Sequence, residues 1–209
     1  VLDDGFQHRK VARSMDVVLI DGRRDLEKES LLPHGRLREP LSSLRRATEV
    51  IVTHAEKIDS QLAEVIHRYH GQEPVAWCNH VWTGLTRHDS EGVEDVPVDS
   101  IAGLRLVTHL GVAQPAGIIR QIESVGGVVT HQCRARDHAK VTPRTILEVE
   151  RAAKDADAIF VTGKDWVKFR GLIEWGTLGK PVFVPQLTMD LINGSEELKQ
   201  RLLGVLERP

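Results

Sequence analysis

The chain has 209 residues, of which 41% are hydrophobic and 28% are charged, and it contains 17 glycines and 9 prolines. This composition excludes disordered, collagen-like and low-complexity proteins, and the length allows one large or two small domains to fold without disulfides. The 28 Lys and Arg residues nearly balance the 30 Asp and Glu residues, giving a formal net charge of −2. Such a surface does not hold nucleic acid by bulk electrostatics, so we expect no nucleic-acid partner and only local anion binding.

Cysteine usage and hydropathy point to a protein of the cytoplasm. Only Cys78 and Cys133 occur, which suits a reducing compartment and excludes a four-cysteine zinc site. The sequence contains no apolar run of about 18 residues and no charged-then-apolar leader, so we expect neither a spanning helix nor a signal peptide.

Short apolar runs alternate along the chain with segments of helical spacing. The runs predict strands at 17–20, 50–53, 104–108, 127–130, 158–162 and 181–184. The helical spacing predicts helices at 40–46, 60–69, 115–125, 143–155 and 195–206. Short apolar strands that alternate with helices are typical of a parallel sheet covered on both faces, so the sequence predicts an α/β fold.

A change of pattern between Trp77 and Ile101 divides the chain. Polar and apolar residues alternate there around the turn sequence 89–92, which predicts a β-hairpin that we interpret as a linker. The last helix could pack on either half. The predicted organisation is a first α/β domain at 1–78, the hairpin linker at 79–100, and a smaller C-terminal α/β domain with a terminal helix at 101–209.

The N-terminal sequence Asp3-Asp4-Gly5 places two carboxylates after a short apolar stretch. Carboxylates at the carboxyl end of a parallel strand project into the crevice where α/β sheets bind ligands, and in phosphate-transfer enzymes they hold Mg²⁺. The alternative is a simple Asp-Asp-Gly turn between strands. These three residues alone leave both interpretations open.

Further motifs give the sequence a resemblance to a known family. DDGFQHR, the loop LLPHGRLREPLSSL, the strand IVTH, the turn LGVAQP, RDH and TGKDWVKF resemble, in order and spacing, the tetraacyldisaccharide 4′-kinases of lipid A biosynthesis. The resemblance implies a P-loop-kinase-like parallel-sheet domain, ATP and Mg²⁺ as cofactors, and transfer of the ATP γ-phosphate to the 4′-hydroxyl of a lipid-linked glucosamine disaccharide. It also implies a cytoplasmic protein in peripheral contact with the bacterial inner membrane.

The resemblance assigns roles to residues of the N-terminal loop. It implies that Asp3 and Asp4 form the acidic pair that holds Mg²⁺, with Asp4 also acting catalytically by orienting the nucleophile. Gln7 and His8 fall in the same active-site loop and are implied to bind the nucleotide.

Two later motifs complete the set. Arg38 and Glu39 match an Arg-Glu-Pro element that is implied to face the phosphates and the metal. His138, preceded by Asp137, is implied to be catalytic by helping to activate the sugar hydroxyl. The basic stripe from Arg134 to Lys140 alternates with period 2 and suits a phosphorylated sugar, although a basic edge strand explains it equally.

The sequence departs from the family pattern in three places, of which one is Ala139-Lys140-Val141 after Asp137-His138, where the family commonly has an aromatic residue. Gly163 stands where the family has Glu in Thr-Glu-Lys-Asp, and no phosphate loop of the form Gly-x-x-x-x-Gly-Lys-[Ser/Thr] occurs in the sequence. The nearest string, at 176–181, lacks the first glycine and has Pro181 in place of the hydroxyl residue. We therefore expect the N-terminal part of the kinase domain, with the phosphate loop, to lie outside this chain, and the chain alone to be inactive.

Other functions are compatible with parts of the sequence. A non-catalytic module that binds a sugar-lipid or an anion needs no phosphate loop, and two α/β halves also suit a sugar-nucleotide-dependent glycosyltransferase. Trp166 and Trp175 flank basic residues and could form a nucleic-acid surface, although core aromatics beside a surface helix are more common. Arg45 and Arg46 could contact lipid headgroups or simply form a solvated helix face.

Overall fold

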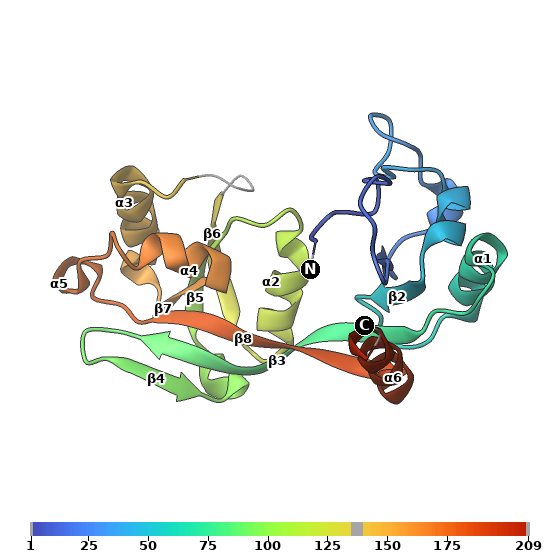
Figure 1. Cartoon of the computed structure of the whole chain (residues 1–209). Coiled ribbons are helices and arrows are strands. Elements are labelled where there is room, and N and C mark those ends of the chain that lie inside the picture. Colours follow the sequence, from blue (N-terminus) through green and yellow to red (C-terminus); the bar gives the residue numbers. More distant parts are fainter. Residues whose placement is uncertain (1, 135–139, 208–209) are drawn as a thin grey trace. The chain divides into compact units, whose positions relative to one another are not determined.

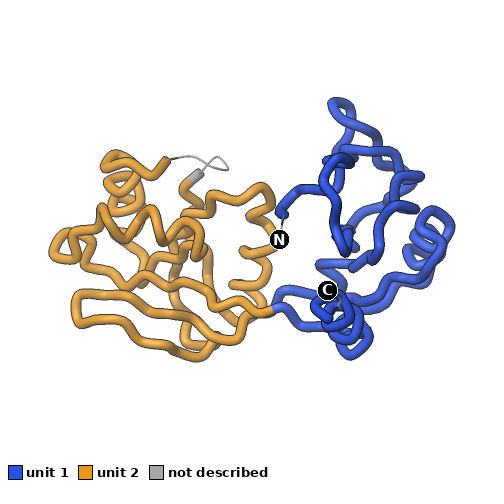
Figure 2. The backbone as a smooth tube through the Cα atoms, viewed as in Figure 1, with its two compact units in different colours: residues 1–81, 189–209 blue, residues 82–188 orange. Residues whose placement is uncertain are grey.

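The computed structural model describes residues 2–134 and 140–207 and has a mixed α/β fold with a mostly parallel sheet (Figure 1). The chain forms two compact units (Figure 2). Unit 1 comprises residues 1–81 and 189–209, and unit 2 comprises residues 82–188. Within the described residues, no helix is both long and apolar enough to cross a membrane.

Unit 1 is built on parallel strands. β1 (Val17–Asp21) pairs in parallel with β2 (Glu49–Thr53), which pairs in parallel with the start of β3 (Ala76–His88). All five residues of β2 are buried, which explains the apolar run at 50–52 in its centre. The helices of the unit are η1 (Leu26–Lys28), η2 (Leu41–Arg46), α1 (Ser60–His70) and α6 (Ser195–Leu206).

Helix α1 shows why this unit folds where the sequence predicts. The Asp59 side chain caps its first turn by accepting hydrogen bonds from the backbone N–H groups of Gln61 and Leu62, and Gly71 ends it with φ 93°. Ile66 is completely buried and packs in a core shared with residues of β1, β2 and η2. The amphipathic spacing and both caps agree, so the local sequence and the packing specify the same helix.

The other strands of the same eight-stranded sheet belong largely to unit 2. β5 (Arg105–Leu110), β6 (Val128–Arg134), β7 (Ala158–Val161) and β8 (Val182–Asn193) are ordered β8-β7-β5-β6, with parallel pairing between β8, β7, β5 and β6. β4 (Val93–Val96) pairs antiparallel with the end of β3, which forms the predicted hairpin. The helices are η3 (Val98–Ile101), α2 (Pro115–Ser124), α3 (Pro143–Ala152), η4 (Ala153–Asp155), α4 (Gly163–Phe169) and α5 (Trp175–Leu178).

The two faces of the unit-2 sheet pack against different helices (Figure 1). Val107 of β5 belongs to a core that contains residues of α3, α4 and α5. Its neighbour Leu106 points to the opposite face and packs with Ile122 of α2 and with Ile101. Successive strand residues point to opposite faces, so a sheet covered on both sides requires the unbroken apolar runs seen in the sequence.

The observed units differ from the predicted domain boundaries. The predicted linker hairpin lies largely within unit 2, and β3 and β8 each continue from one unit into the other. Helix α6, expected at the end of the C-terminal domain, belongs to unit 1. Its Leu198 packs against a core cluster formed by residues of β2 and β3, and Arg201 Nη1 donates to both carboxylate oxygens of Glu49 at 2.8 and 2.7 Å. These contacts join residues far apart in sequence, which is why local spacing does not predict them.

Gly194 connects β8 to α6, and its replacement tests how strongly α6 depends on this turn. It has φ 81°, and a Cβ atom there would lie 1.9 Å from the backbone oxygen of Val75. We expect Gly194→Ala to lower the free energy of unfolding by roughly 2–4 kcal/mol, because both backbone strain and a backbone clash oppose the side chain. Urea unfolding followed by circular dichroism measures this.

Gly204 provides the matched control on the same helix. A Cβ atom there meets nothing within 4 Å, so Gly204→Ala should raise stability by up to about 1 kcal/mol through helix propensity. Equal stabilities for Gly194→Ala and the parent would contradict the close approach to Val75.

Candidate functional site

A pocket of about 1570 Å³ opens within unit 1. Its walls come from the N-terminal loop at 2–7, from β1, from the segment 36–41 and from the last turns of α6. The α6 and β1 side of the pocket is apolar, with Leu19, Leu202 and Leu206 among its residues. The loops supply the polar groups, so the pocket combines an apolar wall with a polar rim, as small-molecule sites do.

The pocket brings together residues that the sequence places in separate motifs. Asp3, Asp4, Gln7, Arg38 and Glu39 all line it, and Arg38 Nη1 donates a hydrogen bond to Asp4 Oδ2. The side chains of Arg38 and Asp4 are exposed, so their ion pair contributes little to stability and its charges stay available to a ligand.

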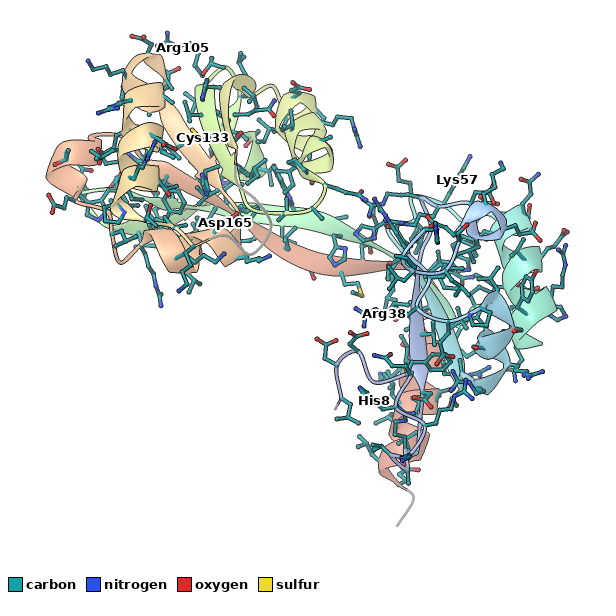
Figure 3. The ribbon with its side chains drawn as sticks, turned by 90° about the horizontal axis from the view of Figure 1, so that it is seen from above. His8, Arg38, Lys57, Arg105, Cys133 and Asp165 are labelled. Carbon is teal, nitrogen blue, oxygen red and sulfur yellow. The ribbon has the colours of Figure 1, made fainter. Side chains whose placement is uncertain are left out.

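His8 lies on the same loop but is not part of the pocket lining. Its side chain is exposed, and Figure 3 labels it on the same unit as Arg38. The structure therefore brings Gln7, but not His8, to the pocket, and nucleotide binding by His8 stays a prediction.

Asp4 has an unusual backbone conformation. Its φ is 54°, in the left-handed region, and among the described residues only His54 shares this feature without being glycine. Asp and Asn tolerate this region better than other non-glycine residues, and strained backbone collects at functional sites. Asp3 and Asp4 form a turn that Gly5 follows directly, but among the described residues no strand precedes this turn, so the carboxylates do not lie at a strand end and the turn does not join two strands. Both residues line the pocket.

Arg13 fixes the loop that carries the acidic pair. Its guanidinium donates to the backbone oxygen of Gly5 and, at 3.1 Å, to that of His8, and its Nε lies 3.1 Å from Asp16 Oδ1. The side chain of Arg13 is 15% exposed, so the loop closes over a largely buried cation. Loop carbonyls that would otherwise face solvent are satisfied, which holds the acidic turn in one conformation.

Glu39 is surrounded by donors and positive charge. Arg46 Nη2 donates to Glu39 Oε2, and Arg9 Nη2 lies 3.7 Å from the same oxygen. Partial burial by itself raises the pKa of the Glu39 carboxyl, but a hydrogen bond from Ser43 and the charges of Arg46 and Arg9 together lower this pKa below its ordinary value. Glu39 is therefore ionised at neutral pH and offers carboxylate oxygen to the pocket.

The charged groups at the carboxyl end of β1 belong to none of the motifs that the sequence indicates. Asp21 ends the strand and accepts hydrogen bonds from Arg23 Nε at 2.8 Å and from Arg23 Nη2 at 2.7 Å. The hydrogen bonds from Arg23 hold the pKa of Asp21 far below its usual range. Asp21 and Arg24 also line the pocket. The signal that could have revealed them is their position after an apolar strand, where α/β proteins collect ligand-binding side chains.

The donor chemistry of the pocket suits Mg²⁺ bound together with phosphate. Within residues 2–134 and 140–207, no three His, Cys, Asp or Glu side chains are placed to share a metal ion. Mg²⁺ rarely needs such a cage, because one or two carboxylates usually hold it while water and substrate phosphates complete the coordination. Asp3 and Asp4 provide hard oxygen donors of this kind at one edge of the pocket.

A buried cluster in unit 2 joins two of the later sequence motifs. Asp165 is 1% exposed and accepts hydrogen bonds from the Gly111 backbone at 2.8 Å and from Thr162 Oγ1 at 2.7 Å (Figure 3 labels Asp165). Lys164 Nζ lies 3.4 Å from the Gly111 oxygen. A Cβ atom at Gly111 would lie 2.5 Å from Asp165 Oδ1. The cluster therefore fixes the turn after β5 to the start of α4, and Asp165 has a structural role.

The structure tests the prediction for the two tryptophans of unit 2 but not the prediction for His138. Asp137 and His138 lie outside the described residues, so the catalytic interpretation of the stripe at 134–140 stays a prediction. Trp166 stacks on His88, with ring centroids 4.1 Å apart, and both Trp166 and Trp175 pack against the core of the unit. These tryptophans are half-buried core aromatics, which is the commoner of the two interpretations that the sequence allowed.

Comparison with known proteins identifies a family. The sequence model of the family described as tetraacyldisaccharide-1-P 4′-kinase matches residues 1–207. A protein of Syntrophotalea carbinolica named tetraacyldisaccharide 4′-kinase is 34% identical over 99% of this chain and 54% of its own length. A protein of the same name from Anaeromyxobacter dehalogenans is 32% identical over 99% of this chain and 55% of its own length.

A solved structure resembles nearly the whole chain. It is LpxK from Aquifex aeolicus, described as an "apo" form in complex with ATP, and it matches with a TM-score of 0.59 and 25% identity over 97% of this chain. The match covers 56% of that protein. The present chain thus spans about half the length of the curated relatives and of the solved structure that it matches.

Proposed function

Because this chain belongs to the tetraacyldisaccharide-1-P 4′-kinase family, we propose that it supplies part of the active site of an enzyme that transfers the γ-phosphate of ATP to the 4′-hydroxyl of a lipid-linked glucosamine disaccharide. The observation that carries the proposal is the pocket of unit 1, where Asp3, Asp4 and Gln7 lie beside Arg38 and Glu39. The names of the relatives and the complex of the Aquifex aeolicus protein with ATP support the same reaction.

The residues of the pocket divide the work of phosphoryl transfer. Asp3 and Asp4 would hold Mg²⁺, which neutralises charge on the phosphates when bound. Arg38 balances the charge of Asp4 and offers guanidinium donors to phosphate oxygens, and Gln7 adds a polar group to the same wall. Glu39, kept ionised by its donors, faces the same space and completes an acidic rim for the metal.

The remaining parts of the proposal concern the acceptor and the location. His138 would accept the proton of the 4′-hydroxyl as the oxygen attacks the γ-phosphorus and the bond to the ADP leaving group breaks. We also propose a P-loop-kinase-like architecture for the complete kinase domain. Its phosphate loop would lie outside these 209 residues, which contain no such motif. A lipid-linked substrate places the enzyme in peripheral contact with the cytoplasmic face of the inner membrane.

The alternatives from the sequence are not favoured. A non-catalytic sugar-lipid or anion-binding module and a sugar-nucleotide-dependent glycosyltransferase both fit two α/β halves, but the matching family and the two relatives carry the name of a kinase.

The test of the proposed function is a chimera with a curated relative. In it, this chain replaces the matching 207-residue region of the Syntrophotalea carbinolica protein. We expect the chimera to transfer ³²P from ATP to the acylated disaccharide 1-phosphate, and the 209-residue chain alone to give no product, because it lacks a phosphate loop.

The controls separate the possible outcomes of this experiment. The unmodified relative establishes that the assay works, and circular dichroism establishes that the chimera is folded. A folded chimera without activity beside an active relative would contradict the proposal. Phosphorylation by the 209-residue chain alone would contradict the expectation that essential groups lie elsewhere.

A further inference from the structure

We propose that Arg46 is a positioning residue of this site, which holds Glu39 and the acidic loop in one arrangement through a single guanidinium group. The inference rests on the proposed function, because it assigns Arg46 to the same pocket. It replaces both interpretations that the sequence suggested for Arg46, a headgroup contact and a solvated helix face.

The guanidinium of Arg46 contacts both sides of the site. Its Nη2 atom donates to Glu39 Oε2, and its Cζ atom lies 4.3 Å from the centroid of the Phe6 ring. Phe6 itself lines the pocket two residues after Asp4. One planar cation therefore connects the Arg-Glu-Pro segment to the loop that carries the acidic pair.

The burial of Arg46 distinguishes it from a surface arginine. Its side chain is 28% exposed and that of Glu39 is 17% exposed, whereas Arg9, the other cation near Glu39, is 67% exposed. The Nε atom of Arg46 is buried with no hydrogen-bond partner among the described residues. Burial of an arginine is tolerated when its charge and its planar face both have partners, which here are Glu39 and the Phe6 ring.

The local helix explains why Arg46 and not Arg45 faces the site. η2 is a 3₁₀ helix with three residues per turn, so Ser43 and Arg46 lie directly one above the other. Ser43 also donates to the Glu39 carboxylate, which places both residues on the Glu39 side of the helix. Arg45 lies on another side of the helix and is exposed. It is the matched control for charge, length and helix position.

Removal of Arg46 should loosen both partners. Among the described residues, Ser43 and the exposed Arg9 would remain as partners of Glu39, and Phe6 would lose the cation that covers its ring. Arg13 would still hold the carbonyls of Gly5 and His8, so the loop should remain folded while the acidic pair becomes more mobile.

The experiment uses the 209-residue chain labelled with 4-fluorophenylalanine. The sequence has 4 phenylalanines, of which Phe6 is in unit 1 and the others are in unit 2, so three ¹⁹F lines serve as internal references. Mn²⁺ is the paramagnetic probe for the Mg²⁺ site. We expect Mn²⁺ to broaden the Phe6 line selectively, and Asp4→Asn to abolish the effect.

Arg46→Met should shift the Phe6 line and raise the Mn²⁺ concentration for half-broadening by about fivefold or more, whereas Arg45→Met should leave both at the parent values. Arg46→Lys should recover part of the Mn²⁺ affinity, because it restores the charge without the planar fork. In the chimera, Arg46→Met should lower kcat about tenfold with an unchanged thermal midpoint. If Arg46→Met does not fold, Arg46→Lys decides the ¹⁹F measurements, and kcat of Phe6→Leu in the chimera tests the contact between Arg46 and the ring.

The outcomes separate the inference from the proposed function. A parent chain that Mn²⁺ does not broaden removes the metal site from the proposed function, and kcat of Arg46→Met in the chimera then decides the role of Arg46. A shifted Phe6 line with parental Mn²⁺ affinity and parental kcat would make Arg46 purely structural and overturn the inference. Parental values in all three measurements would overturn it as well.

Discussion

Asp4→Asn should lower kcat of the chimera by about 10²- to 10³-fold while it changes the affinity for the lipid substrate little. Asp4 lines the pocket and bears the charge that Arg38 balances, so its proposed contribution is greatest when charge develops on the transferring phosphoryl group. Asparagine tolerates the left-handed backbone at φ 54° as well as aspartate does, so the substitution removes charge with little backbone strain. Initial rates at saturating ATP and Mg²⁺ measure the effect.

Asp25→Asn is the matched control for Asp4→Asn. Asp25 is an exposed carboxylate of unit 1 that pairs with Lys28 and does not line the pocket. Its loss should leave turnover unchanged. A parental rate for Asp4→Asn at every Mg²⁺ concentration would reduce the Asp-Asp-Gly sequence to a turn without a catalytic role.

His138→Ala should lower the turnover of the chimera and remove the acid limb of its pH–rate profile. If His138 accepts the proton of the 4′-hydroxyl, it acts only in the neutral form, so the parental rate falls as pH drops through about 6.5. The alanine variant has no group there to protonate, so its lower rate should be nearly constant over the same range. A pH–rate profile from about 5.5 to 8.5 distinguishes the two.

Two neighbouring residues make this experiment specific. His131 is an exposed histidine on β6, and His131→Ala should keep both the parental rate and the acid limb. Lys140→Ala should mainly raise the substrate concentration required, because a lysine contributes to phosphate binding rather than to proton transfer. An intact acid limb in a His138→Ala chimera of near-parental rate would assign the stripe at 134–140 to a solvated surface.

The sequence predicts the parallel α/β core correctly because this core depends on local patterning. The buried strand β7 is a continuous apolar run and β2 has one at its centre, and α1, α2, α3 and α6 begin within the predicted segments. It misses α4 and α5, which are short, and it ends β8 at 184 instead of Asn193. The residues 185–193 have little continuous apolar pattern, because most of them are exposed on their way into unit 1.

The sequence also identifies most of the candidate site, through motifs rather than through spacing. The order of the motifs points to Asp3, Asp4, Gln7, Arg38 and Glu39, and these residues share one pocket. Gln7 lines the pocket and His8 does not. The difference depends on the conformation of the loop, which the residue types of the motif do not specify. His138 lies outside the described residues and stays a prediction.

By itself, the sequence determines the alternation of strands and helices and the acidic, amide and guanidinium groups available for chemistry, because periodicity and residue type are local properties. Only the tertiary structure decides which distant groups meet. Arg46 reads as a solvated cation in the sequence, yet it contacts Glu39 and Phe6, and α6 follows the C-terminal strands, yet its Arg201 pairs with Glu49 of unit 1. The contacts of Arg46 with Phe6 and of Arg201 with Glu49 cross long stretches of chain, whereas Arg46 and Glu39 are seven residues apart. All of these contacts depend on burial, which arises only when the cores have formed.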